Sequence, residues 1–521
     1  MKKENYEFAR YATNDNDARW ADANEIKNAR TITKINVEEE DCPGSGIPLI
    51  SDGRVAYVDS SDTHTLVFGS TGSKKTRLFG MPLINFFALA GESFIATDPK
   101  GELYAKTSGL VEAKGYKTQV LNFRDLGQSD FWNPLRWPYE VYHSGKKDEA
   151  VLLLNDFLNA LIAPLRKGGK DLYFVELGSS MTLAFLLFFI ETATPEEANI
   201  YNLANFCVSN STPEKTEEIA KFMAEGSIAS VNLKGVLANK EAKSTFGNVA
   251  AYLPAMLNSF VIQKKLCKVL SQSSFGVLDV GRQKTAIYII MPDEKTTFHF
   301  LVTAFIKQTY EALIHVAQQQ GDKKLPVRVN FLLDEFGNIP AIPDMAAMVT
   351  AARSRNMRFF IMAQGMRQLR EKYGDNAETI QGNCDNWVFL TSREYELLKQ
   401  ISDLCGMFVY TSHDGTVQSR HLITVSELQR LRKERGETLI LHGRNYPFVT
   451  ELPDIDEYLF AKHPPVQRGE NNLPAIQHYD FKSVIQDIAD KNRPLPFCME
   501  VFDETRYYEK KEPPKNDIFD W

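Results

Sequence analysis

A glycine-rich loop near residue 70 constrains the fold of this 521-residue chain more than any other feature of its sequence. The run His64–Phe68 predicts a short apolar strand, the loop Gly69–Thr76 (GSTGSKKT) follows it directly, and a helix is expected from Arg77. Backbone N–H groups in such a loop surround the phosphates of a nucleotide, because they point inward at the start of a helix. The order of strand, loop and helix predicts an α/β fold with a parallel sheet.

The residues of this loop have separate expected roles. Lys75 would reach the β- and γ-phosphate oxygens, and the Thr76 hydroxyl would ligate Mg²⁺. The residues predicted to bind the nucleotide are Gly69, Ser70, Thr71, Gly72, Ser73, Lys74, Lys75 and Thr76. The alternative is a glycine-rich turn that binds no ligand.

Lys74 departs from the motif, which has a second glycine immediately before the lysine. If the loop requires an unusual backbone angle at this position, a side chain there costs on the order of 1–3 kcal/mol. The side chain of Lys74 would either crowd the phosphates or add positive charge beside them. The sequence therefore leaves open whether the loop supports nucleotide turnover.

A second apolar strand, Val327–Leu333, is followed directly by two acids. Asp334 is suited to hold Mg²⁺, directly or through water, and Glu335 is suited to polarise the water that attacks the γ-phosphate. The next predicted strand, Arg358–Ala363, ends at Gln364. Gln364 is placed to sense the γ-phosphate, unless it is an ordinary polar residue at a strand end.

Short β-rich runs alternate with helical segments along most of the chain. Several are apolar almost throughout, which predicts a doubly wound, mostly parallel sheet covered on both faces. The runs are Thr65–Phe68, Phe94–Thr97, Thr118–Phe123, Ala286–Met291, Val327–Leu333, Arg358–Ala363, Trp387–Thr391 and Thr438–Leu441.

Between about residues 140 and 270 this alternation stops, and the sequence shows helical patterns instead. Two helix starts are expected at Thr194 and Thr212, because each is an N-cap residue followed by proline and acids. A further helix is expected over 148–163, where apolar residues recur at intervals of three and four. We therefore predict an all-helical domain inserted into the α/β domain.

The amino-acid composition limits the kinds of partner that this protein can bind. Lys and Arg number 60 against 67 Asp and Glu, so the net charge of −7 provides no global basic field, and DNA contact requires a local basic surface. The six cysteines lie far apart, which argues against a zinc site and for a reducing compartment. The most apolar run, Leu177–Ile190, is shorter than the ~20 residues that span a bilayer, so we expect a buried helix.

Further motifs, taken with the loop, resemble the conjugative type IV coupling proteins, the TraG-like ATPases related to FtsK-type DNA translocases. The matching segments stand in the family's order between about residues 55 and 445. They are His64–Thr76, Asp98–Tyr104 (DPKGELY), Asn122–Phe123 with Phe131–Leu135 (FWNPL), Leu333–Pro340 (LDEFGNIP), Arg353–Arg355 (RSR) and Gln364. The chain departs from the family at Lys74 and in its polar first twenty residues, where membrane helices are usual.

The resemblance implies a RecA-like P-loop domain that uses ATP and Mg²⁺, carries an inserted all-α domain and acts as a homo-hexamer. Such a protein delivers relaxase-bound single-stranded DNA, as part of the relaxosome, to the channel proteins of a type IV secretion system. In a ring, Arg353 or Arg355 would reach a neighbour's γ-phosphate, unless both are ordinary surface arginines. The alternative function is a non-hydrolysing receptor of the same machinery, in which Lys74 has disabled turnover.

The resemblance also raises the interest of Asp98, Lys100 and Glu102, which follow the strand Phe94–Thr97. Ligands of α/β proteins bind at the carboxyl ends of strands. A nucleotide-binding or pore-loop role therefore stands beside the plainer alternative of a solvated loop.

The expected domains are an N-terminal segment 1–54 without the membrane-anchor region, a nucleotide-binding domain in two parts, an all-α insertion and a C-terminal tail. The nucleotide-binding domain covers residues 55–140 and 271–452, the all-α insertion covers 141–270, and the C-terminal tail covers 453–521. We expect a cytoplasmic protein, peripheral at the inner face of the cell membrane. Either a separate membrane partner docks near Ala18–Ile26, where Trp20 would anchor it unless packed on its own domain, or an anchor was truncated.

Overall fold

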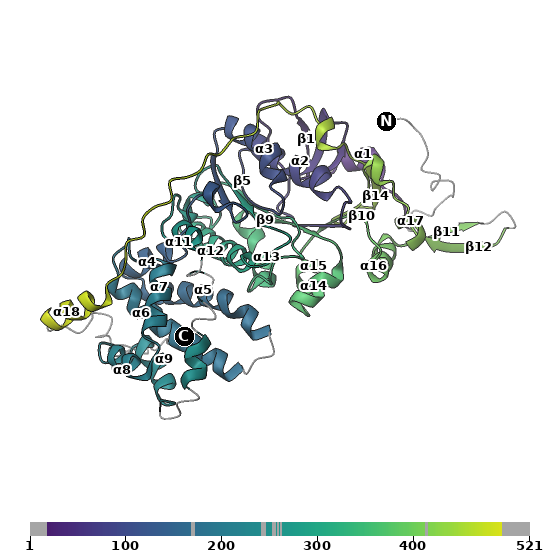
Figure 1. Ribbon diagram of the computed structural model, residues 1–521. Coiled ribbons are helices and arrows are strands. Elements are labelled where there is room, and N and C mark those ends of the chain that lie inside the picture. The colour runs from purple at the N-terminus through teal and green to yellow at the C-terminus, as the bar shows by residue number, and fades with distance from the viewer. Residues whose placement is uncertain are drawn as a thin grey trace, which may run out of the picture. The chain divides into compact units, whose positions relative to one another are not determined.

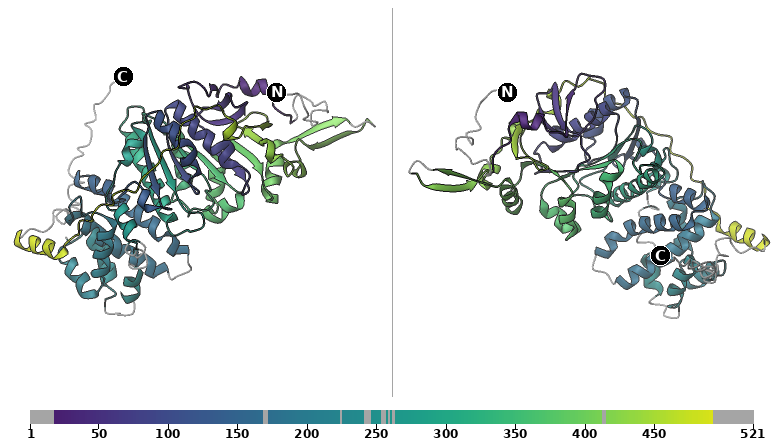
Figure 2. Two further views of the ribbon diagram at one scale, coloured as in Figure 1. Left: turned by 45° about the horizontal axis from the view of Figure 1, so that its top comes forward. Right: turned by 180° about the vertical axis from the view of Figure 1, so that it is seen from behind.

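The computed structural model describes residues 18–167, 172–223, 225–240, 246–252, 257, 260, 263–411 and 415–491. These residues form two compact units, which Figures 1 and 2 show as a sheet-containing part and a helical part. Unit 1 lies within Met1–Asp130 and Ser274–Asn472, and unit 2 lies within Phe131–Ser273 and Leu473–Trp521. The chain therefore passes from unit 1 to unit 2 and back, and it crosses again after residue 472.

Unit 1 is built on a nine-stranded sheet with the order β14-β13-β10-β4-β9-β8-β5-β7-β6. Strands β10 to β6 in this order are parallel, and β13 and β14 add an antiparallel edge. The strands are β4 (Thr65–Gly69), β5 (Ser93–Asp98), β6 (Lys117–Asn122), β7 (Thr285–Ile290), β8 (Val329–Leu333), β9 (Met357–Ala363), β10 (Asn386–Thr391), β13 (Glu437–His442) and β14 (Phe448–Glu451). Every predicted strand lies in this sheet, so the predicted fold class is confirmed; β14 was not predicted.

Helices cover both faces of this sheet (Figure 1). Strands β4, β5, β7, β8 and β9 are consequently buried along their whole length, as their apolar sequences require. The helices of unit 1 are α1 (Ala23–Lys27), α2 (Met81–Ala90), α3 (Glu102–Ala113), α12 (His299–Gln318), α13 (Met345–Ala352), α14 (Met366–Tyr373), α15 (Asn376–Gly382), α16 (Tyr395–Cys405) and α17 (Val425–Leu428). Strand β9 lies between β4 and β8, so the segments that follow these three strands meet at one edge.

A small antiparallel sheet of β1 (Ile32–Asn36), β3 (Val55–Asp59) and β2 (Ile47–Ser51) also belongs to unit 1. It runs across the domain boundary expected at residue 54. A separate hairpin of β11 (Met407–Thr411) and β12 (Val417–His421) extends away from the large sheet (Figures 1 and 2).

Unit 2 is helical in the residues described. Its helices are α4 (Arg136–His143), α5 (Lys147–Lys167), α6 (Leu172–Thr192), α7 (Ile200–Ser209), α8 (Pro213–Ala220), α9 (Ile228–Leu237), α11 (Lys264–Val269) and α18 (Phe481–Lys491). The compact units change at residues 130/131, 273/274 and 472/473, whereas the expected domain boundaries lay at 140, 270 and 452. The division into domains itself stays a prediction.

One of the two predicted helix starts in unit 2 is observed and the other is wrong. Thr212 caps α8, because its side chain accepts the N–H of Lys215. At Thr194 the chain forms only a turn. The next helix begins after Asn199, whose extended backbone (φ −139°) interrupts the turn and whose side chain caps α7.

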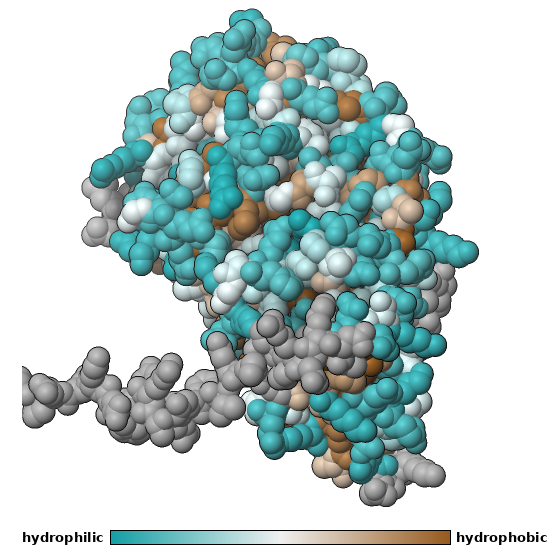
Figure 3. Space-filling model, turned by 90° about the vertical axis from the view of Figure 1, so that its left-hand side faces the viewer, coloured by the Kyte–Doolittle hydropathy of each residue, from teal (hydrophilic) through white to brown (hydrophobic). Residues whose placement is uncertain are grey.

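The apolar run Leu177–Ile190 lies within α6, and 67% of the most apolar window of this helix is buried. Among the described residues, α6 is the one helix long and apolar enough to cross a membrane. The face drawn in Figure 3 is mainly hydrophilic, with apolar atoms in separate patches. The burial of this window fits the expected buried helix.

Trp20 does not form the exposed helical anchor that the sequence suggested. It precedes α1, it is half-buried, and its Nε1 atom is buried without a hydrogen-bond partner among the described residues. The indole therefore packs against its own unit. The separate membrane partner stays a prediction.

Candidate nucleotide-binding site

The glycine-rich loop joins β4 to a π-helical turn, Thr76–Gly80, that continues into α2. Gly69 cannot be replaced without movement, because a Cβ there would lie 2.3 Å from Ser73 Oγ. Lys75 is buried, and its Nζ donates to the Gly69 carbonyl (2.6 Å) and lies 3.7 Å from Glu335 Oε1. An ammonium has three donors, so Lys75 can also donate to a phosphate oxygen.

Of two further features of the loop, one fits a bound phosphate and the other limits which groups can bind it. The Ser73 hydroxyl is buried and, in the part of the chain that the structure describes, has no hydrogen-bond partner. A buried hydroxyl without a partner is costly, and a phosphate oxygen would satisfy it. The backbone N–H of Ser70, in contrast, is already bonded to the Thr391 carbonyl (3.0 Å), so its N–H is not available to a phosphate.

Lys74 adopts the left-handed backbone that the motif normally assigns to glycine, with φ 70°. The loop geometry thus has the strain that the sequence suggested, on the order of 1–2 kcal/mol for a non-glycine residue. The loop nevertheless forms with Lys75 and Thr76 in place.

The Thr76 hydroxyl and the Asp334 carboxylate meet at the same sheet edge, where Thr76 Oγ1 donates to Asp334 Oδ2 (2.8 Å). Burial raises the pKa of Asp334 above its ordinary value, so a cation beside it would be favourable. No cluster of three or more His, Cys, Asp or Glu side chains suited to a metal occurs among the described residues. Mg²⁺ needs few protein ligands, since it retains waters and binds phosphate oxygens, and Thr76 with Asp334 fits this mode.

Glu335 has a strained backbone and a well-oriented side chain. Its φ of 49° is left-handed, and such strain persists only where the surroundings enforce it. Its Oε2 accepts from Gln364 Nε2 (3.1 Å) and Asn338 Nδ2 (3.2 Å). The structure therefore brings together the loop, Asp334, Glu335 and Gln364, and it adds Asn338, to which no role was assigned from the sequence.

Arg353 and Arg355 lie elsewhere. They form a 3₁₀ turn just before β9, whereas Gln364 directly follows this strand. The two arginines and Gln364 therefore lie at opposite ends of β9. Arg353 pairs with Asp385 (2.7 Å), and Arg355 donates to the Ala351 carbonyl (3.0 Å). They take no part in the site of their own chain, and their role toward a neighbouring subunit stays a prediction.

Asp98 is not part of a solvated loop, although Lys100 and Glu102 are exposed. It ends β5, is buried, and accepts the N–H of Tyr104 at the start of α3 (2.9 Å). Burial, with a smaller contribution from the charge of Asp334, raises the pKa of Asp98 to about 6. Asp98 thus lies beside the candidate magnesium ligand.

Two residues near the loop could not be found from sequence. Lys433 is exposed on a turn before β13, and its Nζ lies 3.8 Å from the position of a Cβ at Gly72. Asp454 lies 3.7 Å from Lys74 Nζ. In the sequence they belong to an ordinary basic stretch and an ordinary acidic turn, and only the pairing of β13 and β14 with the sheet brings them to the loop.

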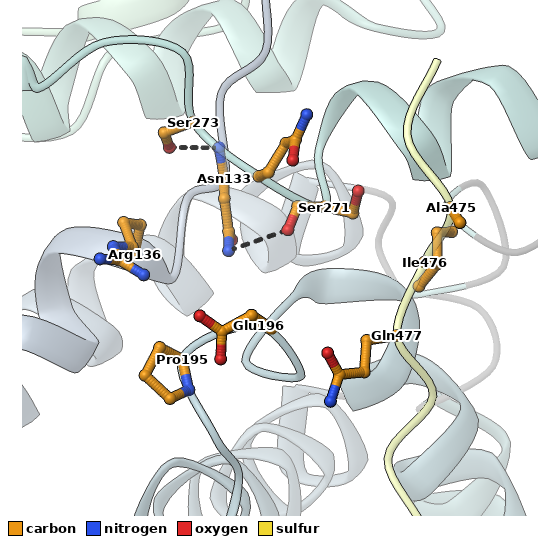
Figure 4. A pocket seen from close by; sticks show the side chains of 10 residues that line it. Asn133, Arg136, Pro195, Glu196, Ser271, Ser273, Ala475, Ile476 and Gln477 are labelled. Carbon is orange, nitrogen blue, oxygen red and sulfur yellow. Dashed lines mark hydrogen bonds between the residues drawn. The ribbon is translucent and has the colours of Figure 1, made fainter. Parts of the chain in front are cut away.

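The FWNPL motif has a structural role in unit 2. The Asn133 side chain donates to the Ala198 carbonyl (2.7 Å) and to the Ser271 carbonyl (3.5 Å), and its backbone N–H donates to Ser273 (Figure 4). Asn133, Ser271 and Ser273 line one side of a polar cavity of about 370 Å³. Gln477 also lines this cavity. The hydrogen bonds of Asn133 thus link the start of the helical segment to its end.

This chain is similar in sequence to one known protein family and to individual known proteins. The model of the family described as type IV secretory system conjugative DNA transfer matches residues 19–436. VirD4 of Rhizobium radiobacter is 23% identical over 82% of this chain, and the TraG conjugal transfer protein of Escherichia coli is 22% identical over 88%. The chain spans 62% of the length of this VirD4 and 76% of TraG.

Among solved structures, the coupling protein TrwB with a non-hydrolysable ATP analogue superposes with a TM-score of 0.59. The alignment covers 89% of this chain and 99% of TrwB at 13% identity. An unbound TrwB structure gives a TM-score of 0.61 at 14% identity, over 88% of this chain and 96% of TrwB. These likenesses show the fold, and the family model covers most of the chain. The chain belongs to the family of type IV secretory system conjugative DNA transfer proteins, as its motifs suggested.

Proposed function

We propose that this protein is an ATP-driven coupling protein, which recruits relaxase-bound single-stranded DNA and passes it to a type IV secretion channel. The observation that carries the proposal is the meeting of Lys75, Thr76, Asp334 and Glu335 at one sheet edge. The solved TrwB structures, whose fold this chain shares, include complexes with an ATP analogue and with ADP and Mg²⁺.

The side chains of the site have separate roles in ATP hydrolysis. The loop Gly69–Thr76 and Lys75 bind the phosphates of ATP, and Thr76 with Asp334 would hold the metal. Bound Mg²⁺ supplies charge that stabilises the transferring phosphoryl group. Glu335, oriented by Gln364 and Asn338, accepts a proton from the attacking water.

The partners follow from the family. We propose a homo-hexamer in the active state, in which Arg353 or Arg355 approaches the nucleotide of a neighbouring subunit. The relaxosome with its single-stranded DNA and the channel proteins are the proposed substrates and partners. The protein would act at the inner face of the cell membrane, held there by a separate membrane protein.

A receptor that does not hydrolyse ATP is the second candidate. The left-handed backbone of Lys74 favours it, because strain in the phosphate loop would impair turnover. The orientation of Glu335 by two amides favours the motor, since a receptor has no chemical need for an oriented base.

Replacing Lys75 by Ala is expected to weaken the binding of a non-hydrolysable ATP analogue with Mg²⁺ at least about tenfold, because a charge-assisted contact to phosphate is lost. Isothermal titration calorimetry measures this affinity. Lys324→Ala, at an exposed lysine in the connection before β8, is the matched control and should bind like the parent. Equal affinities for all three proteins would remove the site assignment.

A further inference from the structure

An acidic turn after β14 contacts two cations, Lys74 of the phosphate loop and Arg77 directly after it. Asp454 precedes the 3₁₀ turn Ile455–Glu457. Its Oδ2 accepts from Arg77 Nε (2.9 Å) and lies 3.7 Å from Lys74 Nζ. Asp456 Oδ2 lies 2.5 Å from the Arg77 guanidinium and does not pair with Lys74. Two carboxylates therefore lie beside Lys74 and Arg77, and Asp456 also pairs with exposed Lys106 (3.2 Å).

The position of this turn is fixed by the core. Asp454 and Glu457 form a reciprocal capping box around it. Directly after the turn, Tyr458 and Phe460 are buried, and their rings pack edge-on against Phe86 of α2 at 6.0 and 5.5 Å. Because α2 continues from the loop, the turn and the loop are held by the same helix.

Asp454 is the ionic partner that the described residues offer to Lys74. Partial burial of Asp454 opposes ionisation, but the Arg77 hydrogen bond and the charges of Arg77 and Lys74 hold the pKa of Asp454 below its ordinary value. Asp454 is consequently charged at neutral pH. An ammonium paired with this carboxylate must give up part of that interaction before it can bind a phosphate oxygen.

We infer that Asp454 is a positioning residue that retains the Lys74 ammonium and so lowers the affinity of the site for nucleoside triphosphates. Lys74 thereby occupies a glycine position without adding its full charge to the phosphate site. The inference rests on the proposed function, since it concerns the same loop. Asp454 lies outside the recognised motifs, and it thereby controls the affinity of the loop for its ligand.

The test is Asp454→Asn, which keeps the size of the side chain and an oxygen that can cap the turn. Affinity for a non-hydrolysable ATP analogue with Mg²⁺ should rise about threefold or more, because Lys74 becomes available to phosphate. The rise should be smaller at high salt, since salt screens the added charge. It should also be smaller for AMP, which carries fewer phosphate charges.

Two controls separate this effect from a general change of charge. Asp456→Asn removes the same charge from the same turn without touching Lys74, and it should change affinity less than about twofold. In a Lys74→Gly background, Asp454→Asn should likewise have less than about a twofold effect. Thermal unfolding of each variant checks that the fold is retained.

An unchanged or lower affinity of Asp454→Asn would overturn the inference. So would an equal rise in the Lys74→Gly background, because the effect would then not pass through Lys74. If the parent binds the analogue and Lys75→Ala loses it, these outcomes count against the role of Asp454 alone. If neither the parent nor any variant binds the analogue, the proposed function falls together with the inference.

Discussion

Replacing Glu335 by Gln is expected to lower the rate of ATP hydrolysis about 100-fold or more, in line with the loss of a general base. The affinity for ATP with Mg²⁺ should stay within about twofold, since Gln keeps the size of the side chain and one of its oxygens. Glu335 Oε2 accepts from two amides, so the carboxylate is oriented before any ligand binds. Phosphate release measures the rate, and calorimetry measures the affinity.

Glu371→Gln is the matched control for this prediction, because Glu371 is exposed on α14 and pairs only with surface Arg367 among the contacts described. Its rate should equal that of the parent. If turnover of Glu335→Gln remained within about twofold of the parent, another residue would have to act as the base.

The largest effect on stability is expected from Arg358→Met. Arg358 is the second residue of the central strand β9 and is fully buried, with its guanidinium 2.6 Å from Glu92 Oε2. It also donates to Asn330 Oδ1 (2.9 Å) and to the Ser45 carbonyl (2.8 Å). Met fills the space but leaves Glu92 buried without its closest cationic partner, although Ser45 Oγ still donates to Glu92 Oε2 (2.6 Å). The free energy of unfolding should fall by about 3–5 kcal/mol, as when one member of a buried ion pair is removed.

Urea denaturation followed by circular dichroism measures this loss. The double variant Arg358→Met with Glu92→Leu should recover part of it, because no buried charge is then left unpaired. A loss below about 1 kcal/mol for Arg358→Met would show that water or Arg328, which lies 3.6 Å from Glu92, compensates for the missing guanidinium.

The sheet and the centre of the site could be predicted because they depend on local patterns. Apolar runs define the strands, and in a parallel sheet the residues that follow neighbouring strands meet at one edge. This rule brings the loop after β4, Asp334 after β8 and Gln364 after β9 together. The same rule separates Arg353 and Arg355 from them, because these arginines precede β9.

Other features depend on contacts between distant parts of the chain. Asp454 lies 377 residues after Arg77, and no local pattern indicates their pairing. Lys433 reaches Gly72 only because β13 pairs with β10, the neighbour of β4. At Thr194 the local pattern is typical of a helix start, but the chain forms only a turn there, and the next helix begins after Asn199, whose backbone is extended.

Steady-state ATP hydrolysis by the protein, with and without single-stranded DNA, tests whether it is an ATP-driven motor. A DNA-delivering motor should hydrolyse ATP faster than the Lys75→Ala variant, and single-stranded DNA should raise the rate further. The same rate for the parent and Lys75→Ala, whether or not DNA is present, would exclude the motor and favour a receptor that binds without turnover.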